Sequence, residues 1–237
     1  MKAGIFTTTI DKIIATGPEL KHFHFAFEPG TVFDFDAGQF VNVLLPGPEA
    51  GKTVKRPYSI ASAPLRKTGF DLCLKLVKGG YATTYFWTLK EGDKVQIQGP
   101  LGRFTARQPL PKALIFISTG TGIAPFRSMI NDLLEKGTSC EIWNIFGNRY
   151  EDEIIYKDEF DALAAKHPNL HNIFTVSRPK TWTGEKEYVQ FMLKKYISNP
   201  AEKNIYICGL TNMINAVEAT ALEMGFAKTQ IFYEKYD

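Results

Sequence analysis

The first hundred residues alternate between apolar and polar positions with a period of two. Residues 22–27 place Phe at every second position, and residues 70–76 place Phe and then Leu in the same way. Further short runs at 39–45, 56–61 and 94–98 are separated by turns that contain Gly or Pro. Short strands at this spacing are typical of an antiparallel barrel. We therefore expect the amino-terminal part of the chain to form such a barrel.

The pattern changes after the turn-rich stretch 108–111. Residues 113–118 form a continuous apolar run, typical of a strand that is buried on both faces. A helical pattern follows over 124–136, and Gly137 is expected to end it. Strands and helices then alternate, with strands expected at 141–146, 172–176, 204–208 and 230–233 and helices at 157–166, 188–196 and 213–224. This order predicts a parallel sheet with helices on both faces, and two domains at 1–108 and 109–237.

Composition and cysteine count exclude several classes of protein. Apolar residues make up 44% and charged residues 22%, which is ordinary for a globular protein. No apolar run approaches the ~18 residues of a membrane span, and the first eleven residues lack the pattern of a signal peptide. We therefore expect a cytoplasmic protein without a membrane span or a nucleic-acid partner. Cys73, Cys140 and Cys208 are too few and too far apart for an iron–sulfur cluster, and no metal site is expected.

The positive charge is concentrated in the first half of the chain. Up to Gln108 there are 14 Lys and Arg against 9 Asp and Glu, and beyond it 14 against 16. A basic half suits an acidic partner or a phosphorylated ligand, although an ordinary solvated surface explains the charge equally well.

The run Ser118–Pro125 (STGTGIAP) directly follows an expected buried strand and opens an expected helix. Glycines at such a place let the backbone approach a pyrophosphate, and the amino-terminal end of the helix offers free N–H groups to it. The third glycine of the usual dinucleotide fingerprint is replaced by Pro125, which the first turn of a helix accommodates. A tight turn without a ligand is the alternative explanation.

Two further motifs lie in the barrel half. In the first, Arg56-Pro57-Tyr58-Ser59, an arginine that can neutralise a phosphate precedes a tyrosine that can stack on a flat ring. An ordinary strand with an exposed arginine is the alternative. In the second, residues 78–84 (KGGYATT), a glycine turn leads into a helical run, and its backbone amides and the Thr83 hydroxyl are placed to hold a second phosphate.

Together and in this order, these motifs resemble the ferredoxin–NADP reductase superfamily over nearly the whole chain. The residues that carry the resemblance also include Gly38-Gln39-Phe40, Gly99-Pro100-Leu101-Gly102, Tyr206-Ile207-Cys208-Gly209 and Tyr233-Glu234-Lys235-Tyr236. The resemblance implies a six-stranded antiparallel FAD-binding barrel followed by a Rossmann-like NAD(P)-binding domain. It further implies a stand-alone, monomeric flavoprotein that takes hydride from a nicotinamide dinucleotide.

The resemblance also assigns roles to individual residues. Arg56 is expected at the FAD pyrophosphate, Tyr58 against the isoalloxazine ring and Ser59 near the flavin nitrogen that accepts hydride. Cys208 is expected beside the nicotinamide, and Tyr236 is expected to stack on the flavin until nicotinamide displaces it; Asp237 follows it. A buried core thiol is the alternative for Cys208. The remaining cofactor-binding residues implied are Pro57, Leu74, Lys75, Gly79, Gly80, Ala82, Thr83, Thr119, Gly120, Thr121, Gly122, Pro125 and Gly209.

The choice of nicotinamide dinucleotide rests on a group of polar residues in the second half. In NADPH-using relatives a Ser-Arg pair, followed by basic and aromatic residues, binds the 2′-phosphate. The matching residues here are Ser177 and Arg178, then Lys186 and Tyr188, with Arg149 after an earlier strand. No acidic residue, as commonly found in NADH enzymes, stands at the matching position. We expect NADPH, with NADH as the alternative.

The expected acceptor is a one-electron carrier, ferredoxin or flavodoxin, because FAD converts a hydride into single-electron steps. Such carriers are usually acidic, and Lys52, Lys55, Lys67, Lys90 and Lys94 are candidates for docking them. Alternatives are an NADH-dependent reductase component of an oxygenase system, a free-flavin reductase, or an electron-transfer subunit of a larger complex. His22 and His24 lie two apart on one strand, but no third ligand is near, so we expect exposed strand residues rather than a metal site.

Overall fold

The computed structural model describes residues 3–17, 19–47, 49, 51–65 and 67–236. The chain divides into two compact units, which are Met1–Thr105 with Ala124–Asp132 and Ala106–Ile123 with Leu133–Asp237. The short segment 124–132 thus contacts the first unit, although it follows the first strand of the second. The domain boundary expected after residue 108 stays a prediction.

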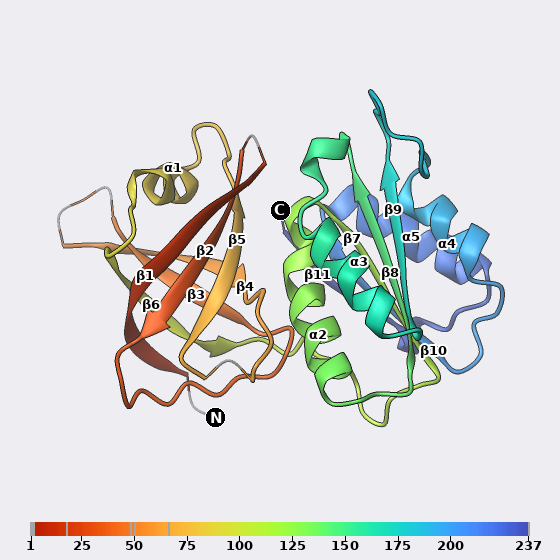
Figure 1. Ribbon diagram of the computed structural model, residues 1–237, viewed down its shortest axis with the longest axis horizontal. Helices are drawn as coiled ribbons and strands as arrows, with labels where there is room; N and C mark the ends of the chain where they lie inside the picture. Colours follow the sequence, from red (N-terminus) through yellow and green to blue (C-terminus); the bar gives the residue numbers. More distant parts are fainter. Residues whose placement is uncertain (1–2, 18, 48, 50, 66, 237) are drawn as a thin grey trace. The chain divides into compact units, whose positions relative to one another are not determined.

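The first unit is the antiparallel barrel that the period-two pattern predicts (Figure 1). Its strands are β1 (Gly4–Gly17), β2 (Leu20–Phe27), β3 (Phe40–Pro46), β4 (Thr53–Ser59), β5 (Gly69–Lys75) and β6 (Lys94–Leu101). They are ordered β4-β3-β6-β1-β2-β5, and every pairing is antiparallel. The barrel closes between β4 and β5, the first and last strands of this order. There the N–H of Ala61, just after β4, donates to the carbonyl of Asp71 in β5 at 2.8 Å.

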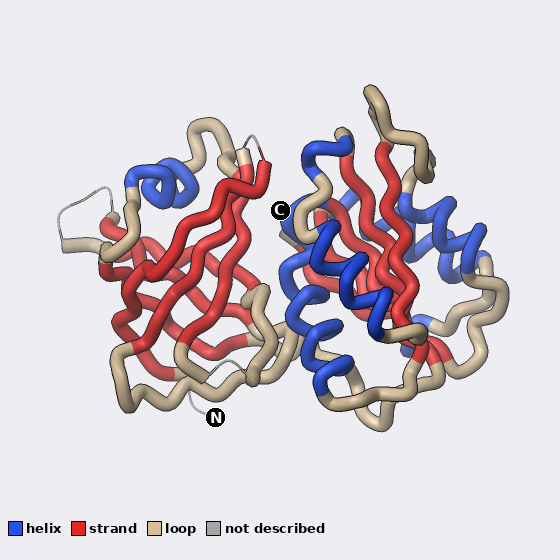
Figure 2. The backbone as a smooth tube through the Cα atoms, in the orientation of Figure 1, coloured by secondary structure: helices blue, strands red, loops and turns tan. Residues whose placement is uncertain are grey.

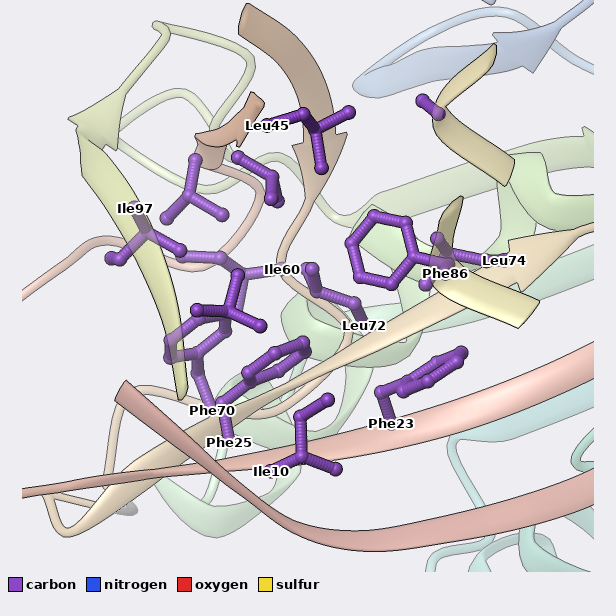
Figure 3. Packing of buried hydrophobic residues seen from close by; sticks show 14 of the residues in the cluster. Ile10, Phe23, Phe25, Leu45, Ile60, Phe70, Leu72, Leu74, Phe86 and Ile97 are labelled. Atoms are coloured by element: carbon purple, nitrogen blue, oxygen red, sulfur yellow. The ribbon is translucent and has the colours of Figure 1, made fainter. Parts of the chain in front are cut away.

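The barrel is filled by aromatic side chains from alternate strand positions. Phe25 of β2 and Phe70 of β5 stack with ring centroids 5.1 Å apart, and Phe23 meets Phe86 edge-on at 5.3 Å (Figure 3). Phe86 comes from helix α1 (Tyr81–Thr88), which packs against one end of the barrel. Each such fully buried ring contributes about 1.5–3 kcal/mol relative to an exposed one, so Phe86 helps to hold α1 against the barrel.

The second unit contains a five-stranded parallel sheet with helices on both sides (Figure 2). Its strands are β7 (Ala113–Thr119), β8 (Glu141–Asn148), β9 (Leu170–Val176), β10 (Lys203–Gly209) and β11 (Ile231–Lys235), in the order β11-β10-β7-β8-β9. Its helices are α3 (Lys157–Lys166), α4 (Val189–Tyr196) and α5 (Thr211–Glu223), with short 3-10 turns η1 (Gly120–Gly122), η2 (Glu151–Glu153) and η3 (Lys228–Gln230). Helix α2 (Ile123–Glu135) begins and ends in this unit, but its middle part, Ala124–Asp132, belongs to the first.

Alternate residues of the central strands face opposite layers of helices. Ile115 and Ile117 of β7 pack in one cluster with side chains of α4 and α5. On the other face, Asn144 of β8 donates to Asn172 of β9 at 3.1 Å, and Asn172 in turn donates to the carbonyl of Phe160 in α3. Because the strands are parallel, their carboxyl ends lie at one edge of the sheet, which helices cover on both sides. This edge is the usual place for a nucleotide in such a fold.

Two expectations from the sequence differ from the structure of the barrel. The pattern analysis did not identify β1, a 14-residue strand that pairs with both β2 and β6. The expectation that His22 and His24 are exposed is wrong. His22 is only 8% exposed, and both imidazoles contact the buried carboxylate of Asp71, His24 at 2.7 Å and His22 at 3.4 Å.

Candidate functional site

The RPYS motif lies on an edge strand of the barrel. β4 pairs only with β3 in the sheet order, so Pro57, which cannot donate a backbone hydrogen bond, is tolerated there. The Arg56 side chain is exposed and donates to the carbonyl of Lys55. Among the described residues Arg56 has no carboxylate partner, so its charge is available to an anion.

Tyr58 and Ser59 are progressively more buried than Arg56. The Tyr58 ring packs edge-on against Phe86 of α1, with centroids 5.5 Å apart. Burial raises the pKa of the Tyr58 phenol to about 12, although the charge of Arg56 acts in the opposite direction. Ser59, at the end of β4, is 6% exposed. The strand thus presents a cation, an aromatic ring and a hydroxyl group in sequence from solvent to interior.

The glycine turn before α1 is held in shape by Thr83. Its hydroxyl donates to the carbonyl of Val77 at 3.2 Å and accepts from the Val77 N–H at 3.1 Å. Gly79 has φ +76°, a left-handed conformation that glycine adopts without strain, and a Cβ there would meet nothing within 4 Å. The direct phosphate contact expected for the Thr83 hydroxyl stays a prediction. In the structure, the hydroxyl supports the turn, and the Gly80 N–H donates to the carbonyl of Val77 at 2.8 Å.

Three other residues of the expected cofactor set lie near this turn. Leu74 and Ala82 belong to the apolar core of the barrel, so their side chains are directed inward. A contact with a bound cofactor would have to come from their backbone. Lys75 is partly exposed at the end of β5, and Gly80 caps α1 with its Cβ position 3.0 Å from the Thr83 hydroxyl oxygen.

In the second unit, the glycine loop follows β7 and leads into α2. Gly120 has φ +54° and open space where a Cβ would be, so its backbone can be approached closely. Gly122 has a different role. A Cβ there would lie 2.3 Å from the carbonyl oxygen of Cys208, which means that the loop packs directly on the end of β10. Thr121 lies between the two glycines in η1, and Pro125 stands in the first turn of α2 as expected.

Cys208 and Gly209 lie at the same edge as this loop. A Cβ at Gly209 would come within 2.8 Å of the Thr119 hydroxyl oxygen, so β7 and β10 meet closely here. The Cys208 thiol is fully buried. Burial, together with the charge of Glu234, raises its pKa well above the usual range, while a hydrogen bond with Tyr236 acts to lower it. Cys208 is therefore a neutral thiol.

Tyr236 is tied to the same edge of the sheet. Its backbone N–H donates to the carbonyl of Gly209 at 3.1 Å, while the residue remains 37% exposed. The structure thus brings Thr119, Gly122, Cys208, Gly209 and Tyr236 together. The stacking of Tyr236 on a flavin stays a prediction, and Asp237, whose effect on it was in question, lies outside the described residues.

The residues expected to select the dinucleotide also converge. The Ser177 N–H donates to the carbonyl of Asn148 at 3.0 Å, and the Arg178 N–H donates to the carbonyl of Arg149 at 2.8 Å. Both pairs lie at the carboxyl ends of β8 and β9. The side chains of Arg149 and Arg178 are exposed, so two guanidinium groups are available at this edge.

Lys186 and Tyr188 join this group through a returning segment. The Val176 N–H donates to the carbonyl of Glu185 at 2.9 Å, and the Thr175 hydroxyl donates to the carbonyl of Glu187. Lys186 is therefore held beside the end of β9, and the exposed Tyr188 caps α4. Within the described residues, Lys186 and the two arginines have no carboxylate partner. The three cations lie on segments that backbone hydrogen bonds hold side by side, and we call them the basic cluster.

The sequence analysis missed a buried charged cluster around Asp71. Besides the two histidines, Arg127 of α2 donates to the Asp71 carboxylate at 3.1 Å and to the carbonyl of Ala61 at 2.9 Å. Both partners belong to the first unit. An aspartate inside the alternating run 70–76 was the one signal in the sequence, because a charge there requires partners.

Comparison with known families agrees with this arrangement. Residues 7–106 match the oxidoreductase FAD-binding domain, and residues 116–219 match the oxidoreductase NAD-binding domain. Ferredoxin–NADP reductase B of Sorangium cellulosum (strain So ce56) is 35% identical to this chain, over 100% of both sequences. The chain belongs to the ferredoxin–NADP reductase superfamily. Like other members of the superfamily, it is an electron-transfer oxidoreductase, with FAD as its flavin cofactor and a nicotinamide dinucleotide as its partner.

One further relative and one solved structure are also similar to this chain. The phenol 2-monooxygenase reductase component DmpP of Pseudomonas sp. (strain CF600) is 32% identical over 96% of this chain, which spans only 64% of that protein. The crystal structure of a ferredoxin NADP+ reductase from Neisseria gonorrhoeae with bound FAD and NADP superposes with a TM-score of 0.86 at 22% identity, covering 98% of each chain. This likeness shows the shared fold. No described helix is long and apolar enough to cross a membrane.

Proposed function

We propose that this protein transfers electrons between NADPH and a one-electron carrier, either ferredoxin or flavodoxin. The observation that carries the choice of NADPH is the basic cluster of Arg149, Arg178 and Lys186 with Ser177 at the ends of β8 and β9. A 2′-phosphate carries charge that three unneutralised cations and a hydroxyl stabilise, whereas the 2′-hydroxyl of NADH gains little from them. The full-length relative named ferredoxin–NADP reductase supports the same choice.

The barrel residues fit FAD. Arg56 provides a cation on an exposed strand, and the backbone at Gly79 borders open space, so a phosphate group can approach it closely. Tyr58 would contact the isoalloxazine ring, and Ser59 would donate a hydrogen bond to it. FAD, when bound, accepts a hydride and returns electrons one at a time. The protein positions the nicotinamide through Thr119, Gly120 and Thr121, and the neutral Cys208 thiol presents no charge to the ring.

The docking residues for an acidic carrier are fewer than the sequence suggests. Three of the five candidate lysines already pair with carboxylates, Lys52 with Glu49, Lys67 with Asp34, and Lys94 with Glu28. Exposed pairs of this kind are worth about 0–1 kcal/mol, so a carrier can displace them at little cost. Lys55, whose ammonium donates to the side chain of Gln98, and Lys90 do not need to break an ion pair.

Substitution of Arg178 tests the choice of dinucleotide. We expect Arg178→Ala to raise KM for NADPH about tenfold and KM for NADH less than twofold, because a bidentate contact to phosphate is lost and NADH has none. Lys166→Ala is the matched control, since it removes an equal charge from the exposed end of α3. If both dinucleotides are affected equally by Arg178→Ala, the arginine does not contact the 2′-phosphate.

A reductase component of an oxygenase system is the second candidate. It is favoured by the 32% identity to the phenol 2-monooxygenase reductase component over nearly all of this chain. The two candidates are separated by supplying NADPH and catalytic amounts of the protein to a ferredoxin or a flavodoxin under anaerobic conditions. Rapid carrier reduction supports the first candidate. Slow carrier reduction with NADPH, together with rapid reduction of an oxygenase iron–sulfur component by NADH, supports the second.

A further inference from the structure

Arg178 is carried on an exposed loop whose shape is set by a neighbouring turn. The loop follows β9 over residues 177–181, and the turn follows β8 over residues 149–153. Besides the backbone hydrogen bonds from Ser177 and Arg178 to the end of β8, a carboxylate of the turn binds the far end of the loop. That carboxylate is Glu151, the first residue of η2.

Glu151 accepts hydrogen bonds from consecutive residues of the loop. Its Oε1 accepts from the backbone N–H of Thr181 at 2.5 Å and from the Thr181 hydroxyl at 2.8 Å. The backbone N–H of Lys180 lies 3.2 Å from both carboxylate oxygens. Two adjacent N–H groups and a hydroxyl on one carboxylate restrict both position and orientation of the loop, so residues 177–181 are held at both ends.

The turn that carries Glu151 is itself rigid. Glu153 accepts from the N–H groups of Arg149 and Tyr150 at 3.2 and 3.4 Å, which closes the turn on itself. The ammonium of Lys180 lies 5.2 Å from the centre of the Tyr150 ring. The backbones that carry Arg149 and Arg178 are therefore held together, with the Arg178 N–H 2.8 Å from the carbonyl of Arg149.

The charge of Glu151 is engaged by these donors. The hydrogen bond from the Thr181 backbone, with those from the Thr181 hydroxyl and Lys180, lowers the pKa of the Glu151 carboxyl to about 2. Glu151 is therefore ionised throughout the neutral range. By its charge alone, a carboxylate near a phosphate site opposes phosphate binding. If charge were its only effect, removing Glu151 would therefore strengthen the binding of the phosphate.

We propose that Glu151 is a positioning residue for dinucleotide selection, which holds the 177–181 loop so that Arg178 meets the 2′-phosphate of NADPH. The inference rests on the proposed function, since it needs a 2′-phosphate to be bound by Arg178. Its physical basis is preorganisation, because an arginine already held in place loses less conformational freedom when the phosphate binds. Glu151 touches neither substrate nor cofactor and acts through Arg178.

The test compares Glu151→Ala, Glu151→Gln and Asp152→Ala in the FAD-loaded protein. Asp152 is exposed and adjacent, so its removal deletes an equal charge without touching the loop. Positioning predicts that Glu151→Ala raises KM for NADPH about fivefold or more, with KM for NADH and kcat within twofold. Glu151→Gln, which keeps an oxygen acceptor, is expected to recover at least half of the loss. A purely electrostatic role predicts the reverse, with tighter NADPH binding in both alanine variants.

A binding measurement without turnover completes the test. Adenosine 2′,5′-bisphosphate and AMP are titrated calorimetrically into each variant. We expect Glu151→Ala to weaken only the bisphosphate, and Asp152→Ala to weaken neither. If the wild-type protein does not distinguish the two nucleotides, the proposed NADPH function fails. If it distinguishes them and Glu151→Ala does so equally well, the proposed function stands and the positioning role of Glu151 is refuted.

Discussion

Replacing Asp71 with asparagine is expected to destabilise the barrel unit, because Asp71 neutralises a buried cluster of potential cations. The side chains of Asp71 and Arg127 are 3% and 16% exposed, and the Asp71 carboxylate also contacts His22 and His24. Asparagine keeps the size of the side chain and removes its charge. Arg127 then remains largely buried without the carboxylate charge, while its guanidinium still donates to the carbonyl of Ala61 at 2.9 Å.

The expected cost is at the lower end of the range for breaking a buried pair. Removal of one partner from a buried ion pair typically costs 3–5 kcal/mol, and because Arg127 keeps the Ala61 contact we expect about 3 kcal/mol. For a chain of this length, ~1 kcal/mol corresponds to roughly 2–4 °C in Tm, so the melting temperature should fall by about 6–12 °C. The double variant Asp71→Asn, Arg127→Met should lose less than the sum of the two single variants, because no uncompensated charge remains.

The effect should depend on pH with a definite sign. Burial acts to raise the pKa of Asp71, but the hydrogen bonds from His22 and His24 and the charges of His22 and Arg127 dominate, and hold it well below its usual range. A carboxyl with a lowered folded-state pKa stabilises the fold above the unfolded value of about 3.9, and this contribution is lost as the pH falls. The difference in Tm between wild type and Asp71→Asn should therefore narrow below about pH 5.

Calorimetric or circular-dichroism melts of the FAD-loaded proteins between about pH 3 and pH 8 measure both effects. Asp34→Asn serves as the control, because Asp34 pairs with Lys67 on the surface and its removal should cost at most ~1 kcal/mol. A Tm within about 2 °C of wild type at pH 7 for Asp71→Asn would refute the reasoning, given the conversion above. A Tm difference between wild type and Asp71→Asn that stays constant as the pH falls would also refute it.

Three further substitutions test the cofactor sites. Gly122→Ala places a Cβ 2.3 Å from the carbonyl oxygen of Cys208, so we expect the end of β10 to shift. Flavin reduction by NADPH should then slow at least tenfold in stopped-flow measurements, which corresponds to an activation barrier raised by about 1.4 kcal/mol or more. Tyr236→Ser should open the nicotinamide site and weaken discrimination between NADPH and NADH in steady-state kinetics; unchanged kinetics would remove the gating role. Arg56→Ala should weaken FAD binding about tenfold or more in fluorescence titrations, whereas Lys55→Ala should leave it within twofold.

The repeating elements could be predicted from the sequence because their signals are local. The apolar run of β7, the helix ended by Gly137 and the alternating strand β2 each depend on neighbouring residues only. β1 was missed because Thr7, Thr8 and Thr9 interrupt the apolar pattern and because its register with β2 shifts twice, between Ile10 and Lys12 and again near its end. A strand with irregular pairing does not keep a period of two.

In the candidate site, too, local motifs could be predicted from the sequence and contacts between distant residues could not. Motifs such as RPYS and STGTG were visible because their residues are contiguous, and within the second unit the structure brings the glycine loop beside Cys208 and Gly209. Contacts between distant residues were not visible. His22 and His24 were expected on a solvated face, but their partner Asp71 lies 47 or more residues away in sequence. Glu151 likewise reaches Thr181 across 30 residues, and a side chain that binds a distant backbone leaves no periodic signal.

The most direct test of the central claim is the absorbance spectrum of the purified protein during anaerobic titration with NADPH and, separately, with NADH. We expect a bound flavin that bleaches with near-stoichiometric NADPH and requires a large excess of NADH. A colourless protein would contradict the assignment of FAD as a tightly held cofactor. A coloured protein that is bleached only by NADH would contradict the role proposed for Arg178 and its neighbours, and would favour the oxygenase-reductase alternative.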